Sequence, residues 1–258
     1  MENAIQRMTN EIVRIMDGEL CGVWLYGSVV LDDFRLGWSD IDFVALSRGG
    51  ISEAQAEKLL FLRQELKKEE PENLYYRSFE GVIAGLKEYR GRSFRRLVYW
   101  GTSGQRITDR CERDCFSELE LAKYGRAVYG DQPWPFPAPG REALRTAVQR
   151  HYESIRKCAV QTDESLYSCG WLLDIARCVY TLRFHDVIAK TQAGVWALEE
   201  RLFSDEEPLK RTLELRRDPL SRKDSEEVKQ WLRGLGPTVQ SYADVLEREL
   251  TRESETSR

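Results

Sequence analysis

The sequence of 258 residues is poor in the side chains that usually bind transition metals. It contains two histidines, His151 and His185, and six cysteines whose spacing does not match a zinc site. Free cysteines are among the side chains most often buried in protein cores. We therefore expect reduced, buried thiols rather than a disulfide framework, as is typical of a cytoplasmic protein.

The chain also lacks a long apolar run and a long basic block. No stretch approaches the roughly 20 apolar residues of a transmembrane helix, and the N-terminal residues lack the apolar core of a signal peptide. The formal net charge is −4, which disfavours a large nucleic-acid footprint. We expect a cytoplasmic protein with no membrane or nucleic-acid partner, and the slight acidity would suit a small cationic substrate.

What the chain does contain is an ordinary globular composition, with 41% hydrophobic and 32% charged residues. Apolar residues in the first half alternate between helical spacing and short continuous runs typical of buried strands. In chain order these patterns predict a helix over 5–16, strands over 23–26 and 41–46, a helix over 52–66 and a strand over 77–86. This order predicts an α+β domain in which helices flank a mixed sheet.

A proline-rich segment separates the two halves of the chain. Residues 131–140 hold four of the eight prolines, which block both helices and central strands. Beyond this segment the pattern is helical over 141–158, 165–184, 190–203, 207–217 and 223–250. We therefore predict two domains, an α+β domain over 1–135 and an all-α helical bundle over 136–258.

Two short motifs in the first half have the chemistry of a phosphate and metal site. Gly27 and Ser28 follow the first predicted strand, where glycine allows close approach to a phosphate and serine can donate hydrogen bonds. Asp40 and Asp42 are two residues apart at the second strand and therefore face the same side. Their carboxylates suit Mg²⁺, which prefers oxygen ligands and commonly binds together with substrate phosphates.

Glu80 is a charged residue inside an otherwise apolar predicted strand. A buried carboxylate without a partner is costly, so Glu80 would need a cation or would act as a general base. An edge-strand glutamate facing solvent is the alternative. Each motif alone is common in proteins, but their combination on consecutive apolar strands predicts a nucleotidyltransferase with a two-metal mechanism.

The combination resembles the signature of the DNA polymerase β-like nucleotidyltransferase superfamily: Gly27-Ser28, the Asp40-Ile41-Asp42 strand and a later carboxylate strand. The second half contains Arg177 on a predicted helix, followed by Lys-Thr-Gln-Ala-Gly-Val-Trp-Ala over 190–197. That pattern is similar to the helical domain of the streptomycin/spectinomycin adenylyltransferases. The resemblance covers about residues 10 to 205.

The resemblance implies a role for each matching position. These roles concern the binding of the nucleotide, the binding of the metal and the activation of the reacting hydroxyl. The nucleotide phosphates would be contacted by Gly27, Ser28 and Ser39, and from the second domain by Arg177 and Lys190. Two Mg²⁺ ions would be held by the catalytic carboxylates Asp40, Asp42 and Glu80, of which Glu80 would also be the catalytic base.

The acceptor site is less well defined by the sequence. Trp100 lies near the position at which the family presents an aromatic side chain to its drug, and Asp163 or Asp174 could attract an amine-bearing acceptor. For each aspartate taken alone, a solvated residue at the end or on the face of a helix is the more common situation. The sequence departs from the family in the loop before Asp40, which carries acidic and aromatic residues in place of glycines.

These observations lead to one main hypothesis and two alternatives. The main hypothesis is a monomeric, Mg²⁺-dependent enzyme that moves AMP from ATP to a hydroxyl of a small cationic acceptor. An aminoglycoside or aminocyclitol antibiotic such as spectinomycin or streptomycin is the expected acceptor, with antibiotic resistance as the consequence. The alternatives are a nucleotidyltransferase of the same fold acting on another small molecule, a protein or RNA, and a non-catalytic nucleotide-binding module.

Overall fold

The computed structural model describes residues 1–101, 104–130 and 133–256. The chain divides into two compact units, Met1–Ala138 and Pro139–Arg258. We refer to them as the N-terminal and C-terminal units. The N-terminal unit is a mixed sheet with flanking helices and the C-terminal unit is helical, which confirms the predicted fold class. The division falls inside the proline-rich segment, of which residues 131 and 132 lie outside the described residues.

A six-stranded sheet forms the centre of the N-terminal unit, with the strand order β5-β4-β3-β2-β1-β6. Its strands are β1 (Leu20–Tyr26), β2 (Ile41–Ser47), β3 (Phe79–Gly85), β4 (Leu97–Gly101), β5 (Gly104–Thr108) and β6 (Arg126–Tyr129). Among these, β2 and β3 pair in parallel and every other neighbouring pair is antiparallel. The sequence patterns predicted β1 to β3 but not β4, β5 or β6.

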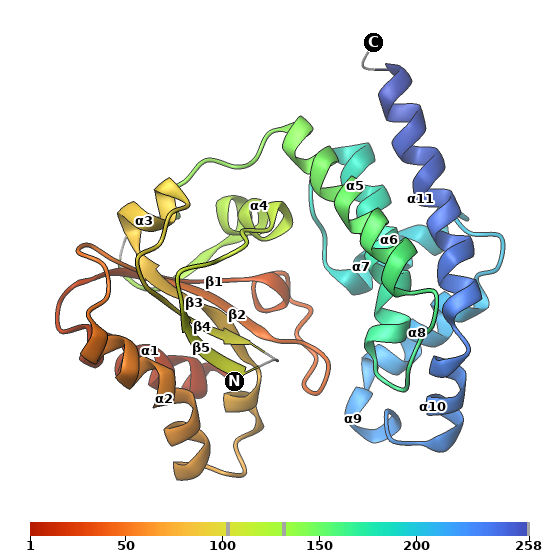
Figure 1. The fold of residues 1–258 in the computed structure, drawn as a ribbon. Helices are drawn as coiled ribbons and strands as arrows, with labels where there is room; N and C mark the ends of the chain where they lie inside the picture. The colour runs from red at the N-terminus through yellow and green to blue at the C-terminus, as the bar shows by residue number, and fades with distance from the viewer. Residues whose placement is uncertain (102–103, 131–132, 257–258) are drawn as a thin grey trace. The chain divides into compact units, whose positions relative to one another are not determined.

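Four helices cover the two faces of this sheet. They are α1 (Glu2–Met16), α2 (Glu53–Glu69), α3 (Leu86–Gly91) and α4 (Cys115–Tyr124), and two short 3-10 helices are η1 (Gly27–Val29) and η2 (Leu74–Arg77). Figure 1 shows α1 and α2 on one face of the sheet and α3 and α4 on the other. The start of α2 is defined by a capping box in which Ser52 and Gln55 satisfy each other's backbone N–H groups.

Because strand side chains alternate, each face of the sheet builds its own apolar core. Phe43, Ile83 and Trp100 are buried on the face covered by α1 and α2. Trp24 and Val44 are buried on the opposite face, where side chains from α3, α4 and the proline-rich segment pack against them. Every apolar strand residue therefore places its immediate neighbours on the other face.

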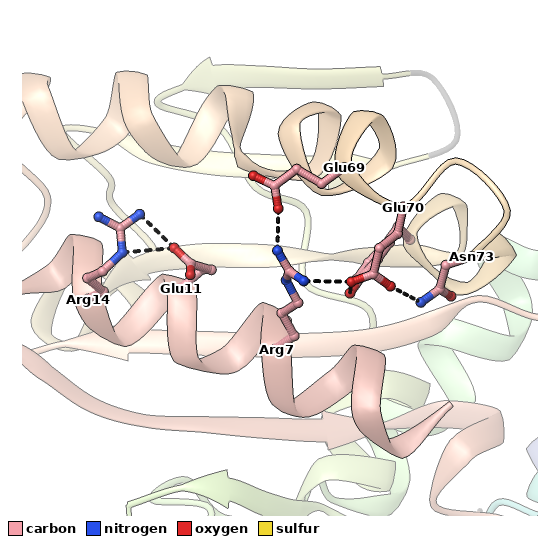
Figure 2. Close-up of polar contacts among 7 residues, drawn as sticks. Arg7, Glu11, Arg14, Glu69, Glu70 and Asn73 are labelled. Carbon is pink, nitrogen blue, oxygen red and sulfur yellow. Dashed lines mark hydrogen bonds and ion pairs between the residues drawn. The ribbon is translucent and has the colours of Figure 1, made fainter.

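An exposed polar network joins α1 to the end of α2 (Figure 2). Arg7 pairs with Glu69, and its second guanidinium nitrogen lies 2.6 Å from Oε1 of Glu70. Glu70 also accepts a 2.8 Å hydrogen bond from the amide of Asn73. Exposed pairs of this kind contribute little to stability, on the order of 0–1 kcal/mol. The buried stripes of both helices, rather than this network, therefore hold them on the sheet.

The C-terminal unit is built around α6, which contacts α5, α7, α8, α10 and α11. Its helices are α5 (Arg141–Cys158), α6 (Tyr167–Phe184), α7 (Lys190–Glu199), α8 (Glu207–Arg217), α9 (Pro219–Arg222), α10 (Glu226–Arg233) and α11 (Gly236–Thr256). The single helix expected over 223–250 is wrong, because the chain breaks near Gly234 and α11 restarts at Gly236-Pro237. Proline lacks an N–H and is tolerated only in the first turn of a helix.

None of the helices in the described part of the chain combines the length and the apolar character that crossing a membrane requires.

Candidate active site

The turn after β1 is held against the carboxylate of Asp42. Gly27 begins η1 with a φ of +68°, in the left-handed region that favours glycine. A Cβ atom at this position would lie 2.2 Å from Oδ2 of Asp42. The backbone of the turn can therefore approach the carboxylate this closely only because residue 27 has no side chain.

The loop between the turn and β2 is stabilised by its own serine hydroxyls. Ser28 donates a 3.2 Å hydrogen bond from its hydroxyl to the backbone oxygen of Asp40. The hydroxyl of Ser39 accepts a 3.0 Å hydrogen bond from the N–H of Arg35, and Ser39 is largely buried. Both predicted phosphate-contacting serines thus organise the segment that leads into the two aspartates.

A row of polar side chains crosses four neighbouring strands on the face that α3 and α4 cover. Tyr26 of β1 is the register partner of Asp42 of β2, and Asp42 is the partner of Glu80 of β3. Tyr99 of β4 continues the row, because its hydroxyl donates a 2.7 Å hydrogen bond to Oε1 of Glu80. We call these four residues the polar row. Strand register therefore places two predicted catalytic carboxylates side by side, with a tyrosine at each end.

Burial and the neighbouring carboxylates raise the pKa values of the two tyrosines of the polar row. Burial raises the pKa of Tyr99, and its hydrogen bond to Glu80 raises it further. Burial also raises the pKa of Tyr26 well above its ordinary value, with the charge of Asp42 adding to the shift. Both phenols are therefore neutral hydroxyls at physiological pH and can donate hydrogen bonds to anionic oxygens.

A buried arginine lies beneath the carboxylates. Arg63 of α2 is 7% exposed and donates hydrogen bonds of 2.7 Å to the backbone oxygen of Phe79 and 3.1 Å to that of Gly101. Burial lowers the pKa of Arg63, whereas the charges of Glu80 and Asp40 oppose that shift. The guanidinium thus supplies positive charge near the carboxylates and ties the start of β3 to the end of β4.

The carboxylates offer only oxygen donors, which suit Mg²⁺ better than zinc. Within residues 1–101, 104–130 and 133–256, no group of three or more His, Cys, Asp or Glu side chains is arranged to hold a metal ion. The predicted three-carboxylate set is therefore not assembled, and one oxygen of Glu80 is bonded to Tyr99 instead. Mg²⁺ often uses one or two carboxylates together with substrate phosphates, and Asp40 with Asp42 fits that requirement.

The C-terminal unit contains a separate charged cluster on α6 and α7. Lys190 Nζ lies 3.0 Å from Oδ1 of Asp174, and Arg177 Nη2 lies 3.3 Å from the same oxygen. Burial alone would raise the pKa of Asp174, but the charges of Lys190, Arg177 and His151 lower it to about 2. Asp174 therefore stays ionised and brings together the two predicted phosphate-binding cations.

The structure places the predicted acceptor contacts in three different environments. Trp100 is fully buried among the core residues of its face, and its indole N–H donates a 3.0 Å hydrogen bond to the backbone oxygen of Leu59. Asp174 is bound to the two cations of its own cluster. Asp163 accepts hydrogen bonds from Ser165 and Ser168 in a local turn just before α6. Trp100 is a core residue here, and the aromatic side chain of β4 on the site face is Tyr99.

Sequence reasoning missed Tyr99 and Arg63. A signal existed for Arg63, since it interrupts the apolar stripe of a predicted helix and a cation at such a position needs a buried partner. Tyr99 could not be found in the same way, because β4 itself was not predicted. Its partnership with Glu80 depends on the pairing of β3 with β4, which no local pattern specifies.

Comparison with known proteins gives a match in structure but none in sequence. No family model matches the chain, and a search of curated proteins finds no match. Among solved structures, the chain is similar to the spectinomycin adenyltransferase AAD(9) from Enterococcus faecialis, crystallised with ATP and spectinomycin. The TM-score is 0.67 at 16% identity, over 95% of this chain and 99% of that chain. The two proteins therefore share a fold over nearly their whole lengths.

Proposed function

We propose that this protein is an adenylyltransferase that moves AMP from ATP to a hydroxyl group of a small cationic acceptor. The observation that carries the proposal is the pairing of Asp42 with Glu80 on adjacent parallel strands, beside the turn at Gly27. The shared fold with a spectinomycin adenyltransferase supports the same reaction class.

The N-terminal unit would bind the reacting end of the nucleotide. The turn at Gly27 and Ser28 offers a close backbone approach and a hydroxyl to a phosphate oxygen. Asp40 and Asp42 would hold Mg²⁺ together with the phosphates. Bound Mg²⁺ supplies neutralisation of the negative charge that develops during phosphoryl transfer.

Glu80 would act as the general base. Its carboxylate takes the proton of the acceptor hydroxyl as that oxygen attacks the α-phosphorus of ATP. A new bond forms between the acceptor oxygen and phosphorus, and the bond to the bridging oxygen breaks. Pyrophosphate leaves with that electron pair, and the products are the adenylylated acceptor and pyrophosphate.

In the C-terminal unit, Arg177 and Lys190 would bind the ATP phosphates. Arginine offers a planar fork of donors and lysine a compact point charge, and both stabilise a polyphosphate. Asp174 would keep the two cations together rather than contact the acceptor, because its carboxylate is already bonded to both. Replacing Arg177 and Lys190 by glutamine should therefore raise the KM for ATP.

For the acceptor, we propose an aminocyclitol or aminoglycoside antibiotic. The net negative charge of the chain and the spectinomycin held by AAD(9) support this class. The test is pyrophosphate release by the purified protein with ATP, Mg²⁺ and a panel of such drugs, with Asp42→Asn as the inactive control. We expect release with at least one drug, and its absence across the panel would contradict the acceptor class.

A second assay separates this proposal from other acceptors. The protein is incubated with ATP labelled on the α-phosphate and a cell extract, and the products are resolved by size. Label on a small molecule supports the proposal, whereas label on protein or RNA would identify a macromolecular acceptor. Tight ATP binding without label transfer under any condition would indicate a non-catalytic module.

A further inference from the structure

We propose that Tyr99 is a positioning residue for Glu80, an inference that rests on the proposed function. The Tyr99 hydroxyl donates to Oε1 of Glu80 at 2.7 Å, which is a normal length for a hydrogen bond to a carboxylate. A glutamate side chain has three rotatable bonds, so one such bond limits its freedom strongly. With Oε1 held by Tyr99, Oε2 is the oxygen that receives the proton of the acceptor.

Two contacts limit the freedom of the Tyr99 ring, one through the next residue of β4 and one from the neighbouring strand β5. Its neighbour Trp100 is anchored in the opposite core by a hydrogen bond to the backbone of α2. Arg106, the register partner of Tyr99 on β5, places its guanidinium carbon 4.2 Å from the centre of the phenol ring. A cation over an aromatic face is attractive, so this contact limits rotation of the ring. The hydroxyl is thus presented to Glu80 by a side chain with little freedom.

The backbones that carry the pair are also joined to each other. The buried guanidinium of Arg63 donates to the carbonyl of Phe79, directly before Glu80, and to that of Gly101, two residues after Tyr99. One rigid group therefore fixes the separation of the two strands beside the hydrogen bond. This arrangement holds the Glu80 carboxylate in place before any substrate binds, which is what a general base requires.

The first test compares Tyr99→Phe with the wild-type protein in the pyrophosphate assay. The free energy of a hydrogen bond to a charged group corresponds to a factor of about 10 to 100 in rate. We therefore expect kcat of Tyr99→Phe to fall by that factor. The KM for ATP should stay within about twofold, because Tyr99 orients the base and does not bind the nucleotide. An unchanged kcat in an active protein would overturn the proposal.

Tyr76→Phe is the matched control. Tyr76 is a buried residue of η2 that also donates its hydroxyl to a glutamate, at 3.4 Å, but this partner is Glu70 of the exposed network at the end of α2. The same atom is removed from the same kind of pair in the same unit. We expect Tyr76→Phe to retain wild-type kcat, and an equal loss in both variants would assign the effect of Tyr99→Phe to general destabilisation.

A second measurement does not depend on turnover. Urea unfolding of the wild-type protein, Tyr99→Phe, Glu80→Ala and the double variant gives the coupling between the two side chains, because alanine removes the acceptor of the hydrogen bond. If the two side chains interact, the double variant loses their hydrogen bond only once. We therefore expect its unfolding equilibrium constant to be about tenfold smaller than the two single effects combined would give. Additive effects would overturn the inference. Coupling in a protein that adenylylates no acceptor would instead count against the proposed function alone.

Discussion

The two units assemble their charged residues by different means. In the N-terminal unit, the polar row is brought together by the register of strands that are far apart in sequence. In the C-terminal unit, Asp174 and Arg177 are three residues apart on α6 and therefore meet on one helical face. The first arrangement places two carboxylates side by side next to a neutral hydroxyl, and the second neutralises one carboxylate with two cations. Under the proposed function, the polar row would take part in the reaction, and the cluster around Asp174 would hold two cations for the ATP phosphates.

The largest expected effect comes from replacing Glu80, the proposed general base of the N-terminal unit. Glu80→Gln keeps the size of the side chain and a partner for Tyr99 but cannot accept the proton of the acceptor. General-base catalysis contributes roughly 10²–10⁴ in rate, so we expect kcat to fall by that factor. The measurement is pyrophosphate release, with circular dichroism to check the fold. A variant with wild-type kcat would remove Glu80 from the mechanism.

The next effect concerns the close approach of the turn to Asp42. Gly27→Ala adds a Cβ 2.2 Å from the carboxylate and also strains a left-handed residue, whereas Gly18→Ala strains a residue at φ +79° with nothing within 4 Å. We expect Gly18→Ala to destabilise the protein by about 1–2 kcal/mol. Gly27→Ala should cost more than this and should abolish activity. Urea unfolding of both variants checks the order, and equal losses would contradict the steric argument.

In the C-terminal unit, Asp174→Asn should destabilise the fold by about 2 kcal/mol at neutral pH. The pKa of Asp174 is depressed to about 2 in the folded protein, so its contribution to stability is complete above the unfolded pKa near 4. That contribution should be lost as the pH falls from about 4 to about 2. The unfolding free energies of the wild type and the variant should therefore converge over this interval.

Asp224→Asn is the control for this measurement. Asp224 is exposed between α9 and α10, and its substitution should change stability by no more than about 0.5 kcal/mol at any pH. If the difference in unfolding free energy between the wild type and Asp174→Asn persists at pH 2, the ion pairs of Asp174 do not account for that difference.

The smallest expected effect is in the exposed network of Figure 2. Arg7→Ala removes both of its ion pairs, with Glu69 and Glu70, yet we expect a loss of less than about 1 kcal/mol because solvent screens exposed charges. Thermal unfolding at low and high salt measures it. A loss as large as that of Asp174→Asn would contradict the contrast between exposed and buried pairs.

Much of the fold was predictable from local patterns, because the apolar runs of β1 and β2 and the spacing of α1, α2, α5 and α6 are strong signals. Glu80 was also correctly placed on a strand. The strands β4 to β6 were missed because all three are too short to show a clear periodicity, and β5 and β6 are also partly exposed. The break near Gly234 was missed because apolar residues keep helical spacing on both sides of it.

The sequence by itself determined the chemistry available to this protein: a glycine-serine turn, two aspartates on one face of a strand and a glutamate in an apolar segment. Local spacing sets these properties, because side-chain direction follows directly from backbone periodicity. Only the tertiary structure decided that Glu80 lies beside Asp42 and that Tyr99, rather than Trp100, is bonded to Glu80. It also decided that the guanidinium of Arg63 joins β3 to β4. These relations depend on strand pairing between distant segments, which a one-residue shift in register would reverse.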